Sequence, residues 1–278
     1  MSDALEIFSC PVCGGALEHT GGNLRCAREH SFDIASQGYV NLLLTGKSGS
    51  GDSAMMVASR RRFLEHGYYE LFRDALSLIV AGIYGRNNAG SVVVVDAGCG
   101  EGYYTAGVCE ALAACGANVK AAGIDISKAA VKSAAKRGCG AAFCVGSAFK
   151  MPLRDSCADI ILSVFAPLSE EEFRRVLRPS GSLIIAAPGP RHLYGLKEAL
   201  YERPYENEPN RFDFDGFETV GVKRVGGIID IDRAEDIRSL FEMTPYYWKT
   251  SEEASKRLET LDRLSTEIQF EFHELRKL

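Results

Sequence analysis

From residue 92 onward the chain alternates short apolar runs with segments of helical spacing. The apolar runs are VVVV (92–95), AAGI (121–124), AAFCV (141–145), IILSVF (160–165) and LIIAA (183–187). Helical candidates lie between them at 103–115, 127–137 and 169–178. Apolar strands that alternate with helices are typical of βα units, whose parallel sheet is covered on both faces. The sequence therefore predicts an α/β fold built on an open parallel sheet.

The pattern is less regular on either side of this region. Before it, apolar residues at helical spacing predict a bridging helical segment over 57–82, interrupted near Gly67. The run RPSG at 178–181 predicts the end of the helix at 169–178. After Pro188 we expect strands at Val220–Val225 and Ile268–Phe272 and helices at 233–242 and 252–263.

The first part of the chain carries two metal-ligand half-sites. Cys10-Pro-Val-Cys13 and Cys26-Ala-Arg-Glu-His30 are a C-x2-C and a C-x3-H knuckle, separated by twelve residues. The segment has too few apolar residues for a core of its own, and three thiolates with one imidazole suit a tetrahedral Zn²⁺. We predict a structural zinc on Cys10, Cys13, Cys26 and His30, because four protein ligands leave no open position for chemistry. His19 is the competing imidazole, interpreted as a solvated loop residue.

Composition excludes several classes of protein. Hydrophobic residues make up 46% and charged residues 25% of the 278 residues, which excludes a disordered or low-complexity chain. We expect neither a signal peptide nor a membrane span, and we expect a cytoplasmic protein whose nine cysteines form no disulfide framework. A net charge of −5 means that any nucleic acid must be held by local groups. Candidates for such contacts are Arg25, Arg28, Lys47 and the run Arg60-Arg61-Arg62, which can equally be a solvated helix face with one arginine turned to a carboxylate.

A glycine-rich turn follows the first predicted strand of the sheet. Asp96-Ala-Gly98-Cys-Gly100-Glu-Gly102 has the spacing G-x-G-x-G, whereas dinucleotide enzymes use G-x-G-x-x-G. Asp96, two residues before the first glycine, suits a ligand with a cationic amino-acid end. These two details favour S-adenosylmethionine over NAD as the ligand at this edge of the sheet.

The next two strands end in further candidate contacts for the cofactor. Asp125, in Gly-Ile-Asp-Ile-Ser, is placed to receive two ribose hydroxyls; the alternative is an N-cap, for which Ser127 is the better residue. The third strand leads into Gly146-Ser147-Ala148, and we expect Ser147 and Ala148 near the adenine edge.

These motifs together resemble a known family. The glycine turn and GID are similar to those of class I S-adenosylmethionine-dependent methyltransferases. The zinc knuckles joined to GYVNLL, with VFAP, APGPRHLYGLKEALY and MTPYYWKT, resemble the bacterial large-subunit (23S) rRNA guanine-N1 methyltransferases, namely large subunit methyltransferase A and its macrolide-resistance relatives. The resemblance covers nearly the whole chain. It implies a Rossmann-like class I methyltransferase sheet with a small N-terminal zinc-ribbon-like module.

The resemblance also implies site residues and partners. Zinc would sit on the four ligands named above, and the cofactor would meet Tyr69, Gly100, Glu101 and His192. The expected division is a zinc module that presents RNA (1–45), a linker and helical bridge (46–90) with a flexible GKSGSG segment, and a methyltransferase domain (91–278). The expected substrate is a hairpin of large-subunit rRNA, methylated at guanine N1 by a homodimer.

Two other functions stay open at this point. A small-molecule methyltransferase, for a quinone or a metabolite, would fit the acidic composition but would not need a zinc module. A non-catalytic zinc-ribbon RNA binder would not need the intact glycine turn and Asp125. The sequence identifies no general base: Glu170, Glu171 and Glu172 are interpreted as the first turn of a helix, and Phe165 as either a base-stacking or a core residue.

Overall fold

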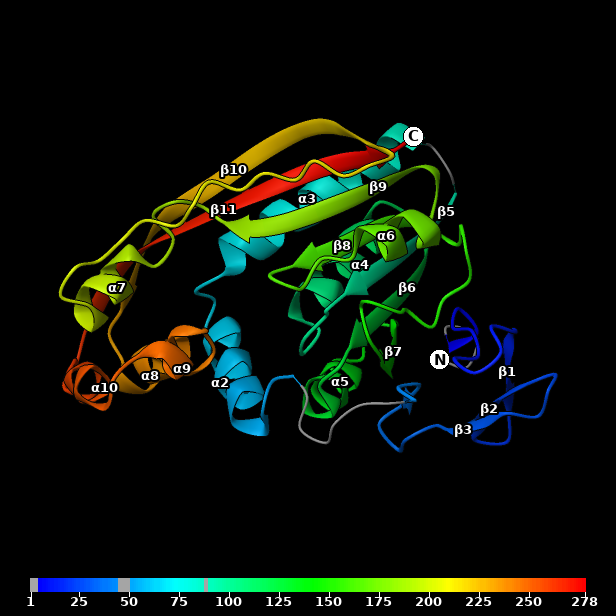
Figure 1. Ribbon diagram of the computed structural model, residues 1–278, viewed down its shortest axis with the longest axis horizontal. Helices are drawn as coiled ribbons and strands as arrows, with labels where there is room; N and C mark the ends of the chain where they lie inside the picture. Colours follow the sequence, from blue (N-terminus) through cyan, green and yellow to red (C-terminus); the bar gives the residue numbers. More distant parts are fainter. Residues whose placement is uncertain (1–4, 45–50, 88–89) are drawn as a thin grey trace.

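The computed structural model describes residues 5–44, 51–87 and 90–278, and these residues form one large sheet and one small sheet (Figure 1). In spatial order the large sheet consists of β10 (Phe217–Ile231), β11 (Leu264–Lys277), β9 (Leu177–Pro188), β8 (Ala158–Val164), β5 (Ser91–Ala97), β6 (Asn118–Asp125), β7 (Ala142–Val145) and β4 (Tyr39–Asn41). The small sheet consists of β1 (Leu17–Thr20), β2 (Asn23–Cys26) and β3 (Ser31–Asp33).

Most neighbours in the large sheet run parallel. The pairs from β4 through β7, β6, β5 and β8 to β9 are all parallel, so their carboxyl ends share one edge. β11 runs antiparallel between β9 and β10. The predicted open α/β sheet is therefore confirmed, with a long antiparallel strand pair added at one side.

The helices follow the predicted order. They are α2 (Ala54–Glu65), α3 (Glu70–Asn87), α4 (Tyr103–Ala114), α5 (Lys128–Ala135), α6 (Glu170–Val176), α7 (Tyr194–Leu200), α8 (Ala234–Glu242), α9 (Tyr246–Lys249) and α10 (Glu252–Glu259). The predicted interruption at Gly67 separates α2 from α3, and Gly67 takes the left-handed φ of 84° that glycine adopts without strain. Within the described ranges, no helix combines the length and the apolar character that crossing a membrane requires.

Two details differ from the sequence expectation. The helix at 169–178 ends earlier, at Val176, and β9 begins at Leu177, so the RPSG run lies within the strand rather than ending the helix. The short strands expected at Val220–Val225 and Ile268–Phe272 are the central parts of β10 and β11, which have 15 and 14 residues. Glycines and charged residues interrupt the apolar pattern of β10, and charged residues interrupt that of β11, which conceals the length of both strands.

The zinc module packs directly onto one face of the large sheet. Along β5, Val94 faces the layer of α3 and α4, where it joins a buried cluster with Phe72. Val95 faces the other side and shares a cluster with Phe8 and Leu24 of the zinc module. This module therefore occupies a place that a covering helix takes in many α/β sheets.

Backbone pairing also joins the module to the sheet. The Ser9 N–H donates to the Pro152 carbonyl at 2.8 Å, and β4, the last strand of the module, pairs in parallel with β7 as the edge strand. Sequence reasoning expected the GKSGSG segment to let the module move relative to the rest, but these contacts hold it against the sheet. Residues 46–50 of that segment, Lys47 included, lie outside the described residues.

Candidate functional site: a zinc module and a cofactor-binding edge

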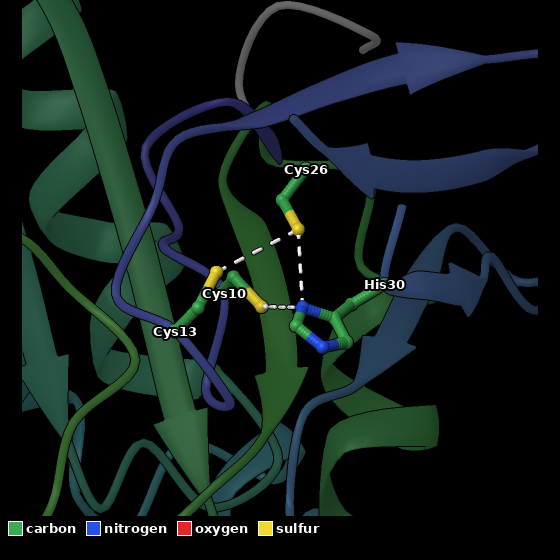
Figure 2. A group of neighbouring side chains, drawn as sticks. All are labelled: Cys10, Cys13, Cys26 and His30. Carbon is green, nitrogen blue, oxygen red and sulfur yellow. Dashed lines mark hydrogen bonds between the residues drawn. The ribbon is translucent and has the colours of Figure 1, made fainter. Parts of the chain in front are cut away.

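The four predicted zinc ligands converge on one point (Figure 2). Their ligand atoms all lie within 4.8 Å of one another. The Cys13 and Cys26 sulfurs are 3.7 Å apart, and His30 Nδ1 lies 3.6 Å from Cys10 Sγ and 3.3 Å from Cys26 Sγ. With metal–sulfur bonds of about 2.3 Å, a tetrahedral zinc separates its ligands by about 3.7 Å. The residues therefore fit a zinc ion bound through three thiolates and the Nδ1 of His30.

Local backbone geometry forms the two knuckles. The Cys10 N–H donates to the Gly15 carbonyl and the Gly14 N–H to the Cys10 carbonyl, both at 2.8 Å, which turns Cys13 back toward Cys10. The second knuckle closes when the Glu29 N–H donates to the Cys26 carbonyl. His19 is exposed and is not part of the cluster, as expected, but it lies on strand β1 and not in a loop.

The predicted glycine turn connects β5 to α4 at the carboxyl edge of the sheet. Gly98 has a φ of 85°, and a Cβ built on it would lie 2.4 Å from the Cβ of Ala166, in the turn after β8. A side chain at this position would therefore push two strand ends apart. The Gly98 N–H donates to the Ile124 carbonyl at 2.8 Å, which ties the turn to β6.

Asp96 is a buried carboxyl with one unsatisfied oxygen. Its Oδ2 accepts a hydrogen bond from the Thr105 hydroxyl, whereas Oδ1 is buried and has no partner among the described residues. Burial raises the pKa of Asp96 to about 7. A cationic group beside Oδ1 would satisfy this oxygen and favour the ionised form, so the residue fits the ammonium end of an amino-acid ligand.

Asp125 lies opposite the glycine turn. The Gly100 N–H donates to its Oδ2 at 3.0 Å and the Ser127 N–H to its Oδ1 at 2.7 Å. Burial raises the pKa of Asp125, while these two hydrogen bonds oppose the rise. Ser127 is the N-cap of α5, accepting from the Ala130 N–H, so the expectation that Asp125 is not the cap is confirmed.

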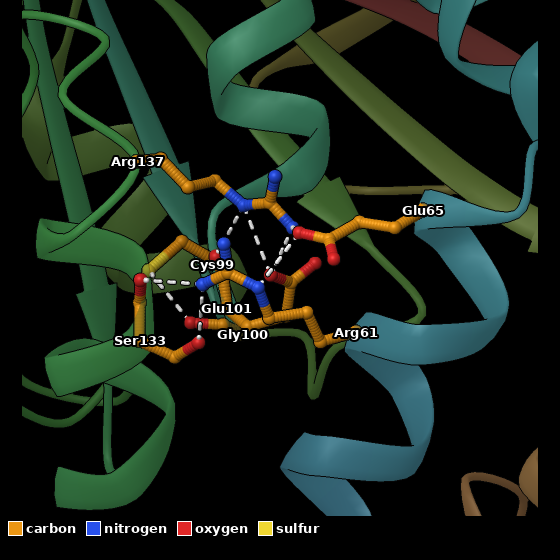
Figure 3. A network of polar contacts seen from close by, with 7 residues as sticks. All are labelled: Arg61, Glu65, Cys99, Gly100, Glu101, Ser133 and Arg137. Carbon is orange, nitrogen blue, oxygen red and sulfur yellow. Dashed lines mark hydrogen bonds and ion pairs between the residues drawn. The ribbon is translucent and has the colours of Figure 1, made fainter.

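Glu101 fixes the glycine turn to the helices around it (Figure 3). Its carboxylate is only 1% exposed and binds Arg137, whose Nε also donates to the Glu101 carbonyl at 2.8 Å. Burial raises the pKa of Glu101 and Arg137 opposes that rise. Arg61 of α2 reaches the same region and donates to the Ser133 hydroxyl at 3.1 Å. Sequence reasoning missed Arg137, because its partner is 36 residues away in the chain.

Tyr69 and His192 meet beside this edge, although 123 residues separate them in sequence. The Gln269 N–H donates to His192 Nδ1 at 3.2 Å, so in the neutral imidazole Nε2 carries the hydrogen. His192 is neutral because burial lowers its pKa to about 3. His192 Nε2 therefore donates to the Tyr69 oxygen, 3.3 Å away, and the Tyr69 hydroxyl hydrogen is left to donate to another group.

Phe165 closes the other side of this region. It is the first residue after β8 and has a φ of 51°, a conformation that costs energy in any residue other than glycine. Its ring stacks on His192 and Phe72 at centroid distances of 6.0 and 5.6 Å, yet the residue is 45% exposed. A core residue would be buried, as the preceding Val164 is, so Phe165 presents an aromatic surface at the carboxyl edge.

Ser147 and Ala148 follow β7 at the same edge. The Ser147 hydroxyl accepts from the Phe149 N–H at 3.2 Å, and the Phe149 side chain after it is exposed. The structure thus places all ten candidate cofactor residues at or beside the carboxyl ends of the strands. Tyr69 directly precedes α3, and His192 lies in the turn after β9.

The three consecutive arginines of α2 are all turned to carboxylates. The pairs are Arg60–Asp52, Arg61–Glu65 and Arg62–Asp236. The sequence left open that one arginine of the run is turned inward; the structure pairs all three. This pairing weakens the expectation that the run contacts nucleic acid. Arg25 and Arg28 of the zinc module are exposed and form no ion pair within the described part of the chain.

Comparison with known proteins agrees with this arrangement. Residues 89–241 match the model of a methyltransferase domain, and residues 8–47 match the zinc ribbon described as "RlmA, N-terminal". The chain is 34% identical over 268 residues to the 23S rRNA (guanine(748)-N(1))-methyltransferase of Streptomyces fradiae, which covers 93% of this chain and 92% of the relative. It is 39% identical over 214 residues, 71% of each chain, to a Micromonospora griseorubida protein whose name assigns it to the 23S rRNA (guanine-N(1)-)-methyltransferases.

This relationship explains both parts of the site. The cluster of three cysteines and one histidine belongs to the zinc ribbon, and the glycine turn belongs to the methyltransferase domain. The predicted fold class, zinc binding and methyltransferase activity are confirmed, and the four predicted zinc ligands lie together in the structure. On its sequence and its fold, this chain belongs to the family of 23S rRNA (guanine-N1) methyltransferases.

Proposed function

We propose that this protein transfers a methyl group from S-adenosylmethionine to N1 of a guanosine in a hairpin of 23S rRNA. One observation carries the proposal. The exposed part of the zinc module and the carboxyl edge with Asp96, the glycine turn and Asp125 belong to one packed body, because Phe8 and Leu24 share a core with the sheet. A macromolecular substrate held by the module can therefore reach the edge without a domain rearrangement.

The residues at the edge fit S-adenosylmethionine, which supplies an electrophilic methyl group on a sulfonium. Asp96 Oδ1 would bind the ammonium group, and Asp125 would accept from the ribose hydroxyls. The backbone of Gly98, Gly100 and Gly102 allows close approach at positive φ. Ser147 and Ala148 would contact the adenine, and Glu101 would hold the turn in place through Arg137.

Tyr69 and His192 orient the ligand from the opposite side. Because His192 donates to Tyr69, the Tyr69 hydroxyl can donate in turn to an acceptor such as a carboxylate. Burial raises the pKa of Tyr69, so its hydroxyl keeps this hydrogen at neutral pH. The pair is therefore a fixed hydrogen-bond donor and has no role in proton removal.

The target guanine must leave its stack before its N1 can reach the methyl group. Phe165 offers the exposed aromatic surface at the carboxyl edge against which the base would stack, with His192 and Phe72 behind it. Holding donor and acceptor in line, away from water, supplies most of the rate enhancement that such a displacement needs.

We also propose that two copies of the chain associate through β10. This strand forms the outer edge of the large sheet over 15 residues, and Val220, Val222 and Ile228 on it are exposed, as are Leu71 and Leu78 of α3 nearby. A long edge strand with exposed apolar side chains and no proline is a template for strand or face pairing, and a second copy offers the same surface by symmetry. Sedimentation should show a dimer that Ile228→Lys converts to a monomer; a wild-type monomer would refute this.

The proposed division of labour is a zinc module (1–45) that presents RNA, a linker and helical bridge (46–90) and a methyltransferase domain (91–278). None of the nine cysteines forms a disulfide in the described structure, and three of them are the proposed zinc ligands, which supports a cytoplasmic location. Pure protein, labelled S-adenosylmethionine and total RNA from a strain lacking the modification test the activity. We expect label in 23S rRNA and 1-methylguanosine after nucleoside digestion. Label only in a small metabolite would establish the small-molecule alternative, and no label with intact RNA binding would establish a non-catalytic binder.

A further inference from the structure

Three lysines form a row along α5. Lys128, Lys132 and Lys136 are spaced four residues apart and all three are exposed; Lys136 is the residue at which the helix ends. Residues at this spacing lie on one face of a helix, and the row extends over about 12 Å. We call these three residues the α5 lysine row. The opposite face of the helix is buried through Ala130, Val131 and Ala134.

The uniform charge of the row, and Lys128 in particular, is unfavourable for the helix, although the helix dipole favours Lys132 in the last turn and Lys136 at the C-cap. Lys128 is the first residue of α5, where the helix dipole favours an anion, and α5 contains no acidic residue. Like charges four residues apart repel each other, and a glutamate between them would have relieved this repulsion. A solvated helix face usually carries both signs of charge. The sequence of α5 instead keeps a uniform positive charge at the expense of helix stability.

Nearby carboxylates do not neutralise the row. Within the described ranges, none of its lysines forms an ion pair. Glu65 and Glu101, the carboxylates that face α5 from α2 and the glycine turn, bind Arg61 and Arg137. The arginine run of α2 shows the opposite arrangement, because every one of its members has a carboxylate partner. The positive potential on this side of the molecule therefore comes from α5.

The row lies between the two parts of the proposed site. α5 starts directly after Asp125 and Ser127, so Lys128 adjoins the cofactor-binding edge. The helix also packs against β4, which is the last strand of the zinc module. In Figure 1, α5 lies between α2 and the zinc module at the same border of the molecule.

We propose that the α5 lysine row binds phosphates of the RNA substrate, forming a track from Arg25 and Arg28 of the zinc module to the methyl-transfer edge. The proposal rests on the proposed RNA substrate. It explains how a protein with a net charge of −5 holds a polyanion, since affinity for a nucleic acid backbone depends on local cations that displace counterions.

The test compares two triple variants of the full-length, zinc-loaded protein. In one, all members of the α5 lysine row are changed to Gln; in the matched control, the exposed Lys120, Lys249 and Lys256 are changed to Gln, which alters the net charge equally. The affinity for the 23S rRNA hairpin is measured by fluorescence anisotropy between 50 and 200 mM salt. Three phosphate contacts lower the slope of log K against log salt by about 2 to 3. We expect this loss, and at least tenfold weaker binding, only in the α5 variant.

Further readouts separate this inference from the function on which it rests. Calorimetry should give the α5 variant an unchanged affinity for S-adenosylhomocysteine, and methylation at saturating RNA should keep its kcat while KM for RNA rises. If wild type methylates the hairpin but the α5 variant keeps the full salt slope, or if both triples lose it equally, the inference is wrong and the proposed function stands. A wild type without salt-dependent binding to the hairpin overturns both.

Discussion

Replacing Arg137 with Ala should destabilise the protein strongly, and by an amount that depends on pH. The change leaves the carboxylate of Glu101, 1% exposed, without its cationic partner, while Glu101 Oε1 already has no partner among the residues that the structure describes. Removing one member of a buried ion pair costs about 3–5 kcal/mol. Protonation limits this cost: neutralising a carboxyl with an ordinary pKa near 4.3 takes about 5 kcal/mol at pH 8 but only about 2 kcal/mol at pH 6.

The sign of the pH dependence follows from the direction of the shift. Burial without Arg137 raises the folded-state pKa of Glu101 above its unfolded value, so stability falls as pH rises from the unfolded pKa toward the folded one. We expect Arg137→Ala to lose about 3–5 kcal/mol at pH 8 and about 2–3 kcal/mol at pH 6, including the contact between Arg137 and the Tyr103 ring. Urea unfolding followed by circular dichroism, with zinc present throughout, measures both values.

Two controls isolate the buried charge. In a Glu101→Gln background, Arg137→Ala should cost only about 1 kcal/mol, at pH 6 and pH 8 alike, because no charge is left unpaired. Arg61→Ala removes the partner of the much more exposed Glu65 and should cost at most about 1 kcal/mol. An Arg137→Ala cost that is equal at the two pH values, or equal in both backgrounds, would refute the reasoning.

Three further predictions concern the edge and the metal. Phe165→Leu should lower kcat for RNA methylation about 10-fold or more and leave affinity for S-adenosylhomocysteine unchanged, whereas Phe165→Tyr keeps activity; equal activity of the two variants would argue against stacking. Gly98→Ala should weaken cofactor binding in calorimetry at least 10-fold, because its Cβ meets Ala166, while Gly116→Ala, equally left-handed but with nothing within 4 Å, should not. Metal analysis should find one zinc per chain and none in a Cys10→Ser, Cys26→Ser double variant, and zinc retained by that variant would contradict the assigned ligands.

The sequence was sufficient where a local pattern determines the structure. The knuckle spacing of Cys10, Cys13, Cys26 and His30 leaves few arrangements that could bind a metal other than the cluster observed. The glycine turn and its position after an apolar strand likewise fix the carboxyl edge of the sheet. In both cases a few residues close in sequence must take up one backbone arrangement, so the chemistry can be predicted before the fold is known.

The parts that could not be predicted depend on distant partners. The arginines of α2 have ordinary spacing for a solvated face, and only the approach of Asp52 and of α8 shows that Arg60 and Arg62 are paired. β4 has only three residues, too few for a recognisable alternation, and β7 defines it. The two hydrogen bonds that run from Gln269 through His192 to Tyr69 likewise could not be predicted, because they form only when β11 lies beside the start of α3.

Because β4 lies at the sheet edge, the amount of correctly folded protein in the cell should depend on the supply of zinc. β7 consists of four buried residues, AFCV, and β4 is the strand that covers its outer side. A chain that acquires no zinc loses the anchor that holds β4, and it then exposes an apolar strand edge of the kind that pairs with other chains. Chaperones and proteases act on such species, so zinc shortage should reduce the amount of enzyme in the cell while each correctly folded molecule works at its normal rate.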